Sequence, residues 1–249
     1  MKNYEILMIV PRYESTNKKR YNYFFPIGLG YIVAVLKKAG YSVDCLNLNH
    51  EKGASEEIIK NYLDKKEYNF VCTGNNALGY KITRKIINSA RAHKSNPKII
   101  LGGPLITSEP DLIFKDLRPD FGVIGEGEGT IVEILEYLKK NKPLKEVRGL
   151  MYWEDDKAIL TEKRVSLNID SIPFPDFDAL GFKEYLDNSA PNYSYMHSVF
   201  DNPRTYYIVG SRSCPFQCTF CWHYDNKYRK RSIDNIMKEL EERVKRYRI

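Results

Sequence analysis

The first 140 residues alternate short apolar runs with longer helical patterns, and this alternation limits the fold more than any other feature. Runs rich in β-branched residues and closed by Gly, Pro, Asn or Thr predict strands at residues 4–10, 42–47, 69–73, 98–101 and 121–124. Helical patterns lie between and after them, at residues 27–39, 55–66 with Ser55 as N-cap, 80–94, 111–117 and 130–140. Strict alternation with apolar strands predicts a parallel sheet covered by helices on both faces.

Glycine loops follow several of these strands. In a parallel sheet of this kind, the ligand crevice lies beyond the carboxyl ends of the strands. Gly102-Gly103-Pro104 and the run from Gly125 to Thr130 lie there, and glycine lets a flat ligand come close to the backbone. Gly28-Leu29-Gly30 lacks the third glycine of a dinucleotide fingerprint and lies far from the first strand, so we interpret it as a helix start that packs closely on the sheet.

The pattern changes after about residue 142. Residues 149–153 and 158–161 flank a polar turn and predict a small hairpin. The segment Ile172-Pro173-Phe174-Pro175 and the Tyr-rich stretch up to Pro203 predict an extended connector, because proline and the residue before it avoid helical conformations. A buried strand is then expected at 205–209, followed by a loop and a helix at 232–248 with Ser232 as N-cap.

Charge and hydropathy exclude several classes of protein. The net charge is +7, but the segment 222–249 holds nine Lys/Arg against five Asp/Glu, so much of the excess is terminal. A local surplus of this kind is typical of a solvated helix and argues against nucleic-acid binding. No run of about 20 apolar residues predicts a membrane span, and the apolar run at 6–10 is too short for a signal peptide. We therefore expect a cytoplasmic protein.

Three of the five cysteines lie within eight positions. Cys214, Cys218 and Cys221 follow the spacing C-x3-C-x2-C in the loop after the last predicted strand. Three thiolates this close can bind three irons of one cubane cluster and leave the fourth iron open to a substrate or cofactor. The alternatives are a Cys3His zinc site that uses His223, or three structural cysteines. Zinc sites usually have paired arms separated by a longer loop, so the spacing favours iron and sulfide.

The region around these cysteines resembles the radical S-adenosylmethionine enzymes. The resemblance rests on Gly210 to Cys214, on Cys218 and Cys221 with Trp222-His223, and on Tyr228 to Ser232. It implies that Cys214, Cys218 and Cys221 hold a 4Fe-4S cluster whose fourth iron binds S-adenosylmethionine, and that Phe220 lies near the adenine. It also implies reductive cleavage to a 5'-deoxyadenosyl radical, with a protein such as flavodoxin or ferredoxin as reductant.

A narrower resemblance covers essentially the whole chain. The glycine loops, the hairpin and the Pro-containing connector are similar to the cobalamin-binding domain that precedes the radical barrel in cobalamin-binding radical S-adenosylmethionine proteins. This implies a Rossmann-like doubly wound α/β domain at 1–142, a hairpin and linker at 143–203, and the N-terminal piece of a radical domain at 204–249. It also implies a set of cobalamin contacts: Thr73, Gly74, Asn75, Gly102, Gly103, Gly125, Glu126 and Gly127.

One departure from cobalamin domains concerns histidine. Domains of the methionine synthase type carry D-x-H-x-x-G after the first strand, whereas residues 11–25 contain no His. His50-Glu51-Lys52-Gly53 supplies H-x-x-G, but Leu48 stands at the Asp position and the segment follows the second strand, so we interpret the match as coincidence. We expect cobalamin without a protein imidazole ligand. His93 and His197 are interpreted as surface residues.

The resulting hypothesis is a cobalamin-dependent radical enzyme acting on a small-molecule substrate, by methyl transfer to an unactivated carbon or by a related rearrangement or ring closure. One alternative is a radical tRNA methylthiotransferase, although that family carries three N-terminal cysteines and only Cys45 and Cys72 are present here. The other alternative is a non-catalytic cobalamin-binding module.

The last 46 residues supply only the first β/α unit of a partial TIM-like barrel. One such unit cannot bury its own core. We therefore expect the chain to be a fragment that is incomplete for catalysis, with an exposed apolar stripe on its last helix: Ile233, Ile236, Met237, Leu240 and Val244.

Overall fold

A five-stranded parallel sheet forms the centre of the molecule, as the alternating pattern predicts. A computed structural model describes residues 4–13, 23–188, 204–225 and 227–249. The parallel strands are β1 (Glu5–Val10), β2 (Ser42–Asn47), β3 (Phe70–Gly74), β4 (Lys98–Gly102) and β5 (Phe121–Val123), in the order β2-β1-β3-β4-β5. Each lies within one residue of its predicted bounds. The apolar residues of β1, β3, β4 and β5 are buried on both faces, which is why those runs are continuous instead of alternating, whereas Val43 and Cys45 of the edge strand β2 are half-buried.

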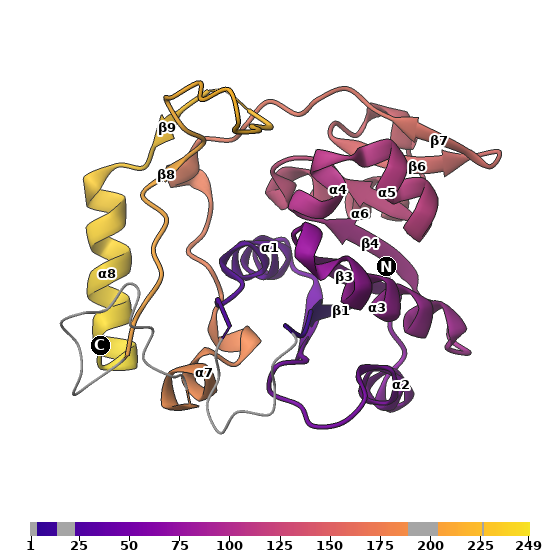
Figure 1. The fold of residues 1–249 in the computed structure, drawn as a ribbon, viewed down its shortest axis with the longest axis horizontal. Helices are drawn as coiled ribbons and strands as arrows, with labels where there is room; N and C mark the ends of the chain where they lie inside the picture. The colour runs from indigo at the N-terminus through magenta and orange to yellow at the C-terminus, as the bar shows by residue number, and fades with distance from the viewer. Residues whose placement is uncertain (1–3, 14–22, 189–203, 226) are drawn as a thin grey trace.

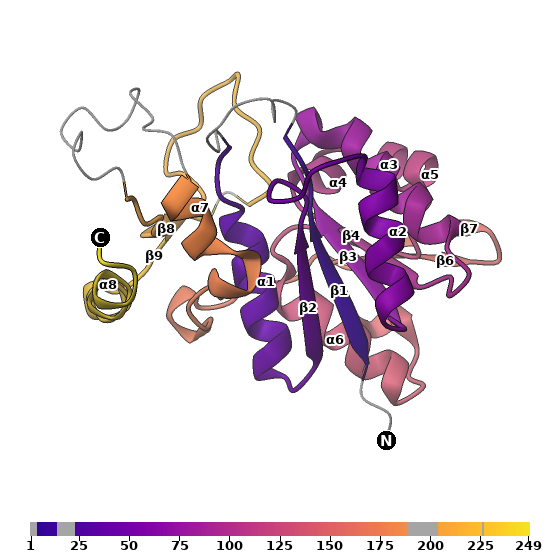
Figure 2. The same ribbon diagram turned by 90° about the horizontal axis from the view of Figure 1, so that it is seen from below.

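Helices cover both faces of this sheet, so the fold is doubly wound (Figures 1 and 2). One face is covered by α1 (Ile27–Lys38) and α6 (Gly127–Lys139). The opposite face is covered by α2 (Ser55–Lys65), α3 (Tyr80–Ala92), α4 (Pro104–Ser108) and α5 (Pro110–Leu117). Short 3-10 helices span Ala77–Gly79, Leu144–Glu146, Ile169–Ser171 and Asp178–Leu180.

The predicted hairpin is confirmed, and it extends the sheet to seven strands. Its strands β6 (Leu150–Glu154) and β7 (Lys157–Leu160) are antiparallel, and β6 pairs with β5. The turn residues Asp155 and Asp156 both have positive φ, which suits the right-handed twist of a two-residue hairpin.

The connector packs on the outer side of α1 and contains one more helix. Gly30 lies so close to the Phe177 ring that an added Cβ would be 2.7 Å from it, and Lys37 pairs with Asp176 at 2.7 Å. The expectation of extended chain up to Pro203 is wrong at α7 (Phe182–Asn188). Residues 176–190 contain no proline, and there α7 buries Phe182, Tyr185 and Leu186 at helical spacing.

The buried strand expected at 205–209 is also corrected. These residues are half-buried and have no strand partner among the residues that the structure describes. A strand requires a neighbour to pair with, and aromatic packing of Tyr206 takes its place. A two-stranded ladder, β8 (Ser211–Arg212) with β9 (Arg229–Lys230), instead closes the loop that carries the three cysteines.

The last helix, α8, spans Ile233–Tyr247 and begins as predicted: the Ser232 hydroxyl accepts a hydrogen bond from the Asn235 N–H at 3.2 Å. The same prediction is wrong for Ser55, which is the first residue inside α2. Ala54 occupies the cap position there, in an extended conformation and without a side-chain bond. Within the described parts of the chain, no helix has the length and apolar character needed to cross a membrane.

Candidate functional site

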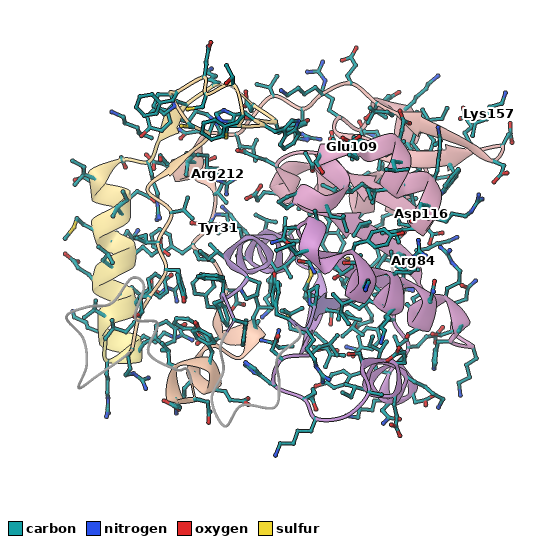
Figure 3. All side chains as sticks on the ribbon, in the orientation of Figure 1. Tyr31, Arg84, Glu109, Asp116, Lys157 and Arg212 are labelled. Atoms are coloured by element: carbon teal, nitrogen blue, oxygen red, sulfur yellow. The ribbon has the colours of Figure 1, made fainter. Side chains whose placement is uncertain are left out.

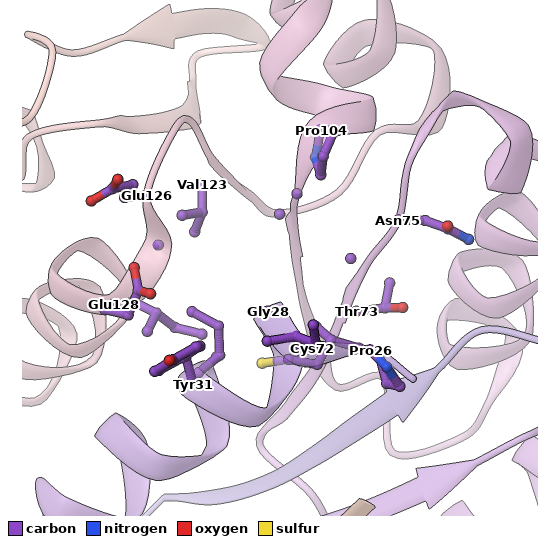
Figure 4. Close-up of a pocket in the computed structure, with 18 of the residues that line it drawn as sticks. Pro26, Gly28, Tyr31, Cys72, Thr73, Asn75, Pro104, Val123, Glu126 and Glu128 are labelled. Carbon is purple, nitrogen blue, oxygen red and sulfur yellow. The ribbon is translucent and has the colours of Figure 1, made fainter. Parts of the chain in front are cut away.

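A cavity of about 500 Å³ opens at the carboxyl ends of β1, β3, β4 and β5 (Figure 4). The connections from β1 and β3 lead to helices on opposite faces of the sheet, so their ends diverge and leave a crevice between them. The volume lies in the range of about 300–1,000 Å³ that is typical of small-molecule sites. The cavity therefore lies where a sheet of this topology binds ligands.

All the residues predicted to contact cobalamin line this one cavity. Three loops supply them, after β3, after β4 and at the start of α6. Parallel strands end at the same edge of the sheet, which brings these loops together although up to 54 positions separate them in the sequence. The residues are Thr73, Gly74, Asn75, Gly102, Gly103, Gly125, Glu126 and Gly127.

Backbone packing explains the glycines of the first two loops. Gly103 has a φ of +86°, and an added Cβ would lie 3.0 Å from the backbone N and O atoms of Asn75. At Gly74, an added Cβ would lie 3.1 Å from the carbonyl oxygen of Gly102. The main chains after β3 and β4 thus touch each other, and a larger residue would force them apart.

The start of α1 forms a further wall of the cavity, which was not among the predicted cobalamin contacts. Pro26, Ile27, Gly28 and Tyr31 line the cavity from this helix. An added Cβ at Gly28 would meet no heavy atom within 4 Å, so this glycine leaves open space at the rim. The Gly28-Leu29-Gly30 motif was the available signal. It was correctly interpreted as a helix start, but the close packing of Gly30 is against Phe177 and Pro175 of the connector and not against the sheet.

Uncharged side chains form the floor of the cavity. Met8 and Cys72 lie side by side on β1 and β3, and burial raises the pKa of the Cys72 thiol, which keeps it protonated at neutral pH. The Thr73 hydroxyl donates to the Ile9 carbonyl at 2.9 Å. Burial also raises the pKa of Tyr13, whose hydroxyl donates to Asn75 Oδ1 at 3.3 Å. These groups offer a ligand neutral contacts.

The opposite wall carries charge. Arg212 Nη2 lies 2.5 Å from Glu128 Oε1, and Arg212 Nη1 lies 3.3 Å from Glu126 Oε2. The Arg212 guanidinium is 5.2 Å from the centre of the Tyr31 ring (Figure 3). Burial opposes the charged form of Arg212, but the hydrogen bond and charge of Glu128 outweigh it and raise the pKa of Arg212. The arginine thus stays charged beside the cavity.

The cysteine loop lies next to this wall, since Arg212 precedes Cys214 by two residues. Cys214 is half-buried, whereas Cys218 and Cys221 are exposed. His223 Nε2 lies 3.1 Å from Cys221 Sγ. Phe220 is 91% exposed. Among the described residues, no three His, Cys, Asp or Glu side chains are already arranged to hold a metal ion, so the structure does not bring the three thiols together.

His50 and His93 lie away from the cavity and the cysteine loop. His50 is absent from the cavity lining, and its ring contacts the Tyr23 hydroxyl at 2.7 Å and Glu184 at 3.3 Å. His93 is not a surface residue as expected: its ring is buried between Ser95, at 2.7 Å, and Asp64, at 3.1 Å, because α3 ends against α2 there. His197 lies outside the described residues.

Comparison with known proteins identifies the domain that contains the cavity. Residues 16–135 match the family described as the B12 binding domain. The chain is 27% identical over 246 residues to an uncharacterized methyltransferase of Pyrococcus horikoshii, which covers 96% of this chain and 50% of that protein. It is 24% identical to the anaerobic magnesium-protoporphyrin IX monomethyl ester cyclase of Cereibacter sphaeroides, over 96% of this chain and 38% of the relative. The chain thus spans about half the length, or less, of these curated relatives.

A solved structure shares the fold. The cobalamin-dependent S-adenosylmethionine radical enzyme OxsB, with aqua-cobalamin and S-adenosylmethionine bound, aligns with a TM-score of 0.73 at 21% identity, over 98% of this chain and 32% of that one. The mostly parallel sheet with helices on both faces is the Rossmann-like fold of cobalamin-binding domains. The chain is thus similar over residues 16–135 to the B12 binding domain, and over most of its length to these methyltransferase and cyclase relatives.

Proposed function

We propose that this chain binds cobalamin in the cavity and a 4Fe-4S cluster on Cys214, Cys218 and Cys221, as part of an enzyme that cleaves S-adenosylmethionine reductively. The reaction served is methyl transfer or a related radical carbon–carbon step on a small-molecule substrate, with a redox protein such as flavodoxin or ferredoxin as reductant. The observation that carries the proposal is that three separate glycine loops and the residue two positions before Cys214 line the same cavity.

The lining combines apolar and neutral polar side chains, which fits one face of a large cofactor that carries amide groups around an apolar ring. Gly102 and Gly103 line the cavity and carry no side chain, so their main-chain atoms can contact a ligand. Met8 and Cys72 provide an apolar floor, and the raised pKa of Cys72 keeps charge away from it. When bound, cobalamin supplies the cobalt chemistry of the reaction. The protein positions the cofactor and keeps water from its buried side.

The three thiols are the donor set that iron-sulfur clusters use. A reduced cluster supplies the electron for cleavage of S-adenosylmethionine. Because Cys218 and Cys221 are exposed, the loop can close around a cluster without unfolding the sheet domain. Phe220, between them in the sequence, is proposed to contact the adenine, and its full exposure leaves its ring free for such a contact.

Cobalamin binding is tested by filling the cavity rim. Gly28→Leu adds a side chain where the structure has open space, so the fold is retained while part of the ligand volume is lost. We expect affinity for hydroxocobalamin, followed by its absorption spectrum, to fall about 5- to 150-fold, since overpacking costs about 1–3 kcal/mol. Asn88→Leu, exposed on α3, is the matched control and should bind like the unaltered chain. Equal affinity for both variants would place cobalamin elsewhere.

Cluster binding is tested by anaerobic reconstitution with iron and sulfide. We expect about four irons per chain, lost in Cys218→Ala. Cys45→Ala is the control, because Cys45 lies in β2 and burial raises the pKa of its thiol to about 12, which makes it a poor ligand. A chain that takes up zinc but no iron would contradict the proposal and favour a site that includes His223.

A further inference from the structure

Four charged side chains join the cysteine loop to the turn that begins α6. Arg212 pairs with Glu128 at 2.5 Å and with Glu126 at 3.3 Å, and Arg229 pairs with the other oxygen of Glu126. The four side chains are between 6% and 23% exposed. We call this group the arginine–glutamate link. Partly buried pairs of this kind are less screened by solvent than surface pairs.

The link holds both ends of the cysteine loop. Arg212 lies in β8 and Arg229 in β9, and these two residues are partners in the ladder that closes the loop. Glu126 and Glu128 flank Gly127 at the start of α6. The loop between the two arginines carries all three cysteines, and its described backbone contains few hydrogen bonds to other elements. Lys163 and Ser166 also bond the loop, at Tyr224 and Asp225. The link is therefore one of several contacts that set the position of the loop, and it is the one that holds both of its ends.

The same link forms part of the cavity wall. Arg212, Glu126 and Glu128 all line the cavity, and so does Tyr31, whose ring faces the Arg212 guanidinium. A ligand that enters the cavity excludes water from these pairs, and loss of water strengthens an ion pair that is already formed. The cavity and the cysteine loop thus contact the same group of charged side chains.

We infer that Arg212, Arg229, Glu126 and Glu128 are positioning residues that couple occupation of the cavity to the position of the cysteine loop. This inference rests on the proposed function, since it takes cobalamin as the occupant. A coupling between two sites is reciprocal: an ordered loop raises cobalamin affinity by the factor by which cobalamin orders the loop. A purely structural link would stabilise the loop equally with and without the ligand.

Amide hydrogen exchange of residues 213–225 tests the coupling in the 249-residue chain without iron. Saturating hydroxocobalamin should slow exchange about fivefold or more in the unaltered protein. In Glu128→Gln and in Arg212→Gln, each at its own saturating concentration, exchange should stay near the ligand-free rate, and cobalamin affinity should fall by the same factor. Arg212→Lys should retain part of the effect, because lysine keeps the charge but loses the planar two-point contact.

Lys98→Gln is the control, because the Lys98–Asp120 pair lies at the opposite end of β4. It should leave both measurements unchanged. If hydroxocobalamin binds but does not slow exchange in the unaltered chain, or if both Gln variants keep the protection, the inference is overturned while the proposed function stands. If hydroxocobalamin does not bind, both are overturned. Should Arg212→Gln fail to fold, Glu128→Gln decides the question.

Discussion

Helices α1 and α8 bury opposite kinds of surface. The buried side of α1 is apolar and includes Val33, Ala34 and Leu36, which pack on the central sheet. The buried side of α8 consists of Glu239, Arg243 and Tyr247, whereas Ile233, Met237 and Val244 are exposed. The stripe expected on α8 is therefore exposed at these three positions, and Ile236 and Leu240 are half-buried.

The difference shows which interactions hold each helix in place. Hydrophobic burial positions α1 and is not directional. Directional bonds position α8: Tyr206 donates to Glu239 at 2.5 Å, Glu239 pairs with Arg231, and Tyr247 donates to Asp178 at 2.8 Å. Figure 1 shows α8 on the far side of α1 from the sheet. The C-terminal segment thus rests on the domain through specific polar and aromatic contacts, which can be removed one by one.

The largest expected effect comes from the buried pair of α8. Glu239→Ala leaves the Arg231 guanidinium, whose side chain is 3% exposed, without its carboxylate. Loss of one partner of a buried pair costs about 3–5 kcal/mol, and here the cost falls on opening of α8, measured by hydrogen exchange. The double variant Arg231→Met/Glu239→Leu should regain most of it. If exchange in α8 is unchanged in Glu239→Ala, polar contacts do not hold the helix.

Truncation in α1 should act on the whole domain. Leu36→Ala removes a fully buried side chain and should lower the free energy of unfolding by about 2–5 kcal/mol in denaturant titrations. Ile233→Ala on α8, where the side chain is 77% exposed, should change it by less than about 0.5 kcal/mol. Equal losses of unfolding free energy in Leu36→Ala and Ile233→Ala would contradict the difference proposed between α1 and α8.

The cap of α8 should contribute a smaller amount. Ser232→Ala removes the bond to the Asn235 N–H and should destabilise α8 by about 1 kcal/mol, seen as faster exchange in its first turn. Ser55→Ala serves as the comparison, since Ser55 makes no capping bond in α2 and no cap is lost. A larger loss at Ser55 than at Ser232 would reverse the assignment of the two caps.

The smallest effect is expected on the exposed stripe. Val244→Lys should change the stability of the chain by no more than about 0.5 kcal/mol, because the Val244 side chain is exposed. Thermal unfolding and size-exclusion chromatography measure this. A clear loss of stability, or a change in elution, would mean that another surface covers the stripe in solution.

The sequence was sufficient to predict elements whose signals are local. Apolar runs, helix periods and turn residues identified the five parallel strands, the hairpin and the long helices. Helix α4 was missed because five residues are too few to show a period. The strand at 205–209 was predicted wrongly because aromatic and β-branched composition reports burial, while pairing depends on a neighbour that composition does not reveal.

Part of the cavity lining could also be predicted from the sequence. The residues after β3, β4 and β5 could be grouped because strands of a parallel sheet end at one edge. Tyr31 and Arg212 could not, because their meeting depends on how α1 and the cysteine loop pack across the domain. The arrangement of Cys214, Cys218 and Cys221 was clear as a spacing, but spacing alone does not bring the thiols together.

The close backbone contact among Gly74, Gly103 and Asn75 has a consequence for how the cavity can diversify. At these glycines, the groups offered to a ligand are peptide N–H and C=O groups, which every residue except proline carries. On the side of Tyr31 and Arg212, the groups are side chains that a single codon can replace. Selection for a new ligand would therefore leave the backbone contacts at these glycines unchanged and act on the side chains around them.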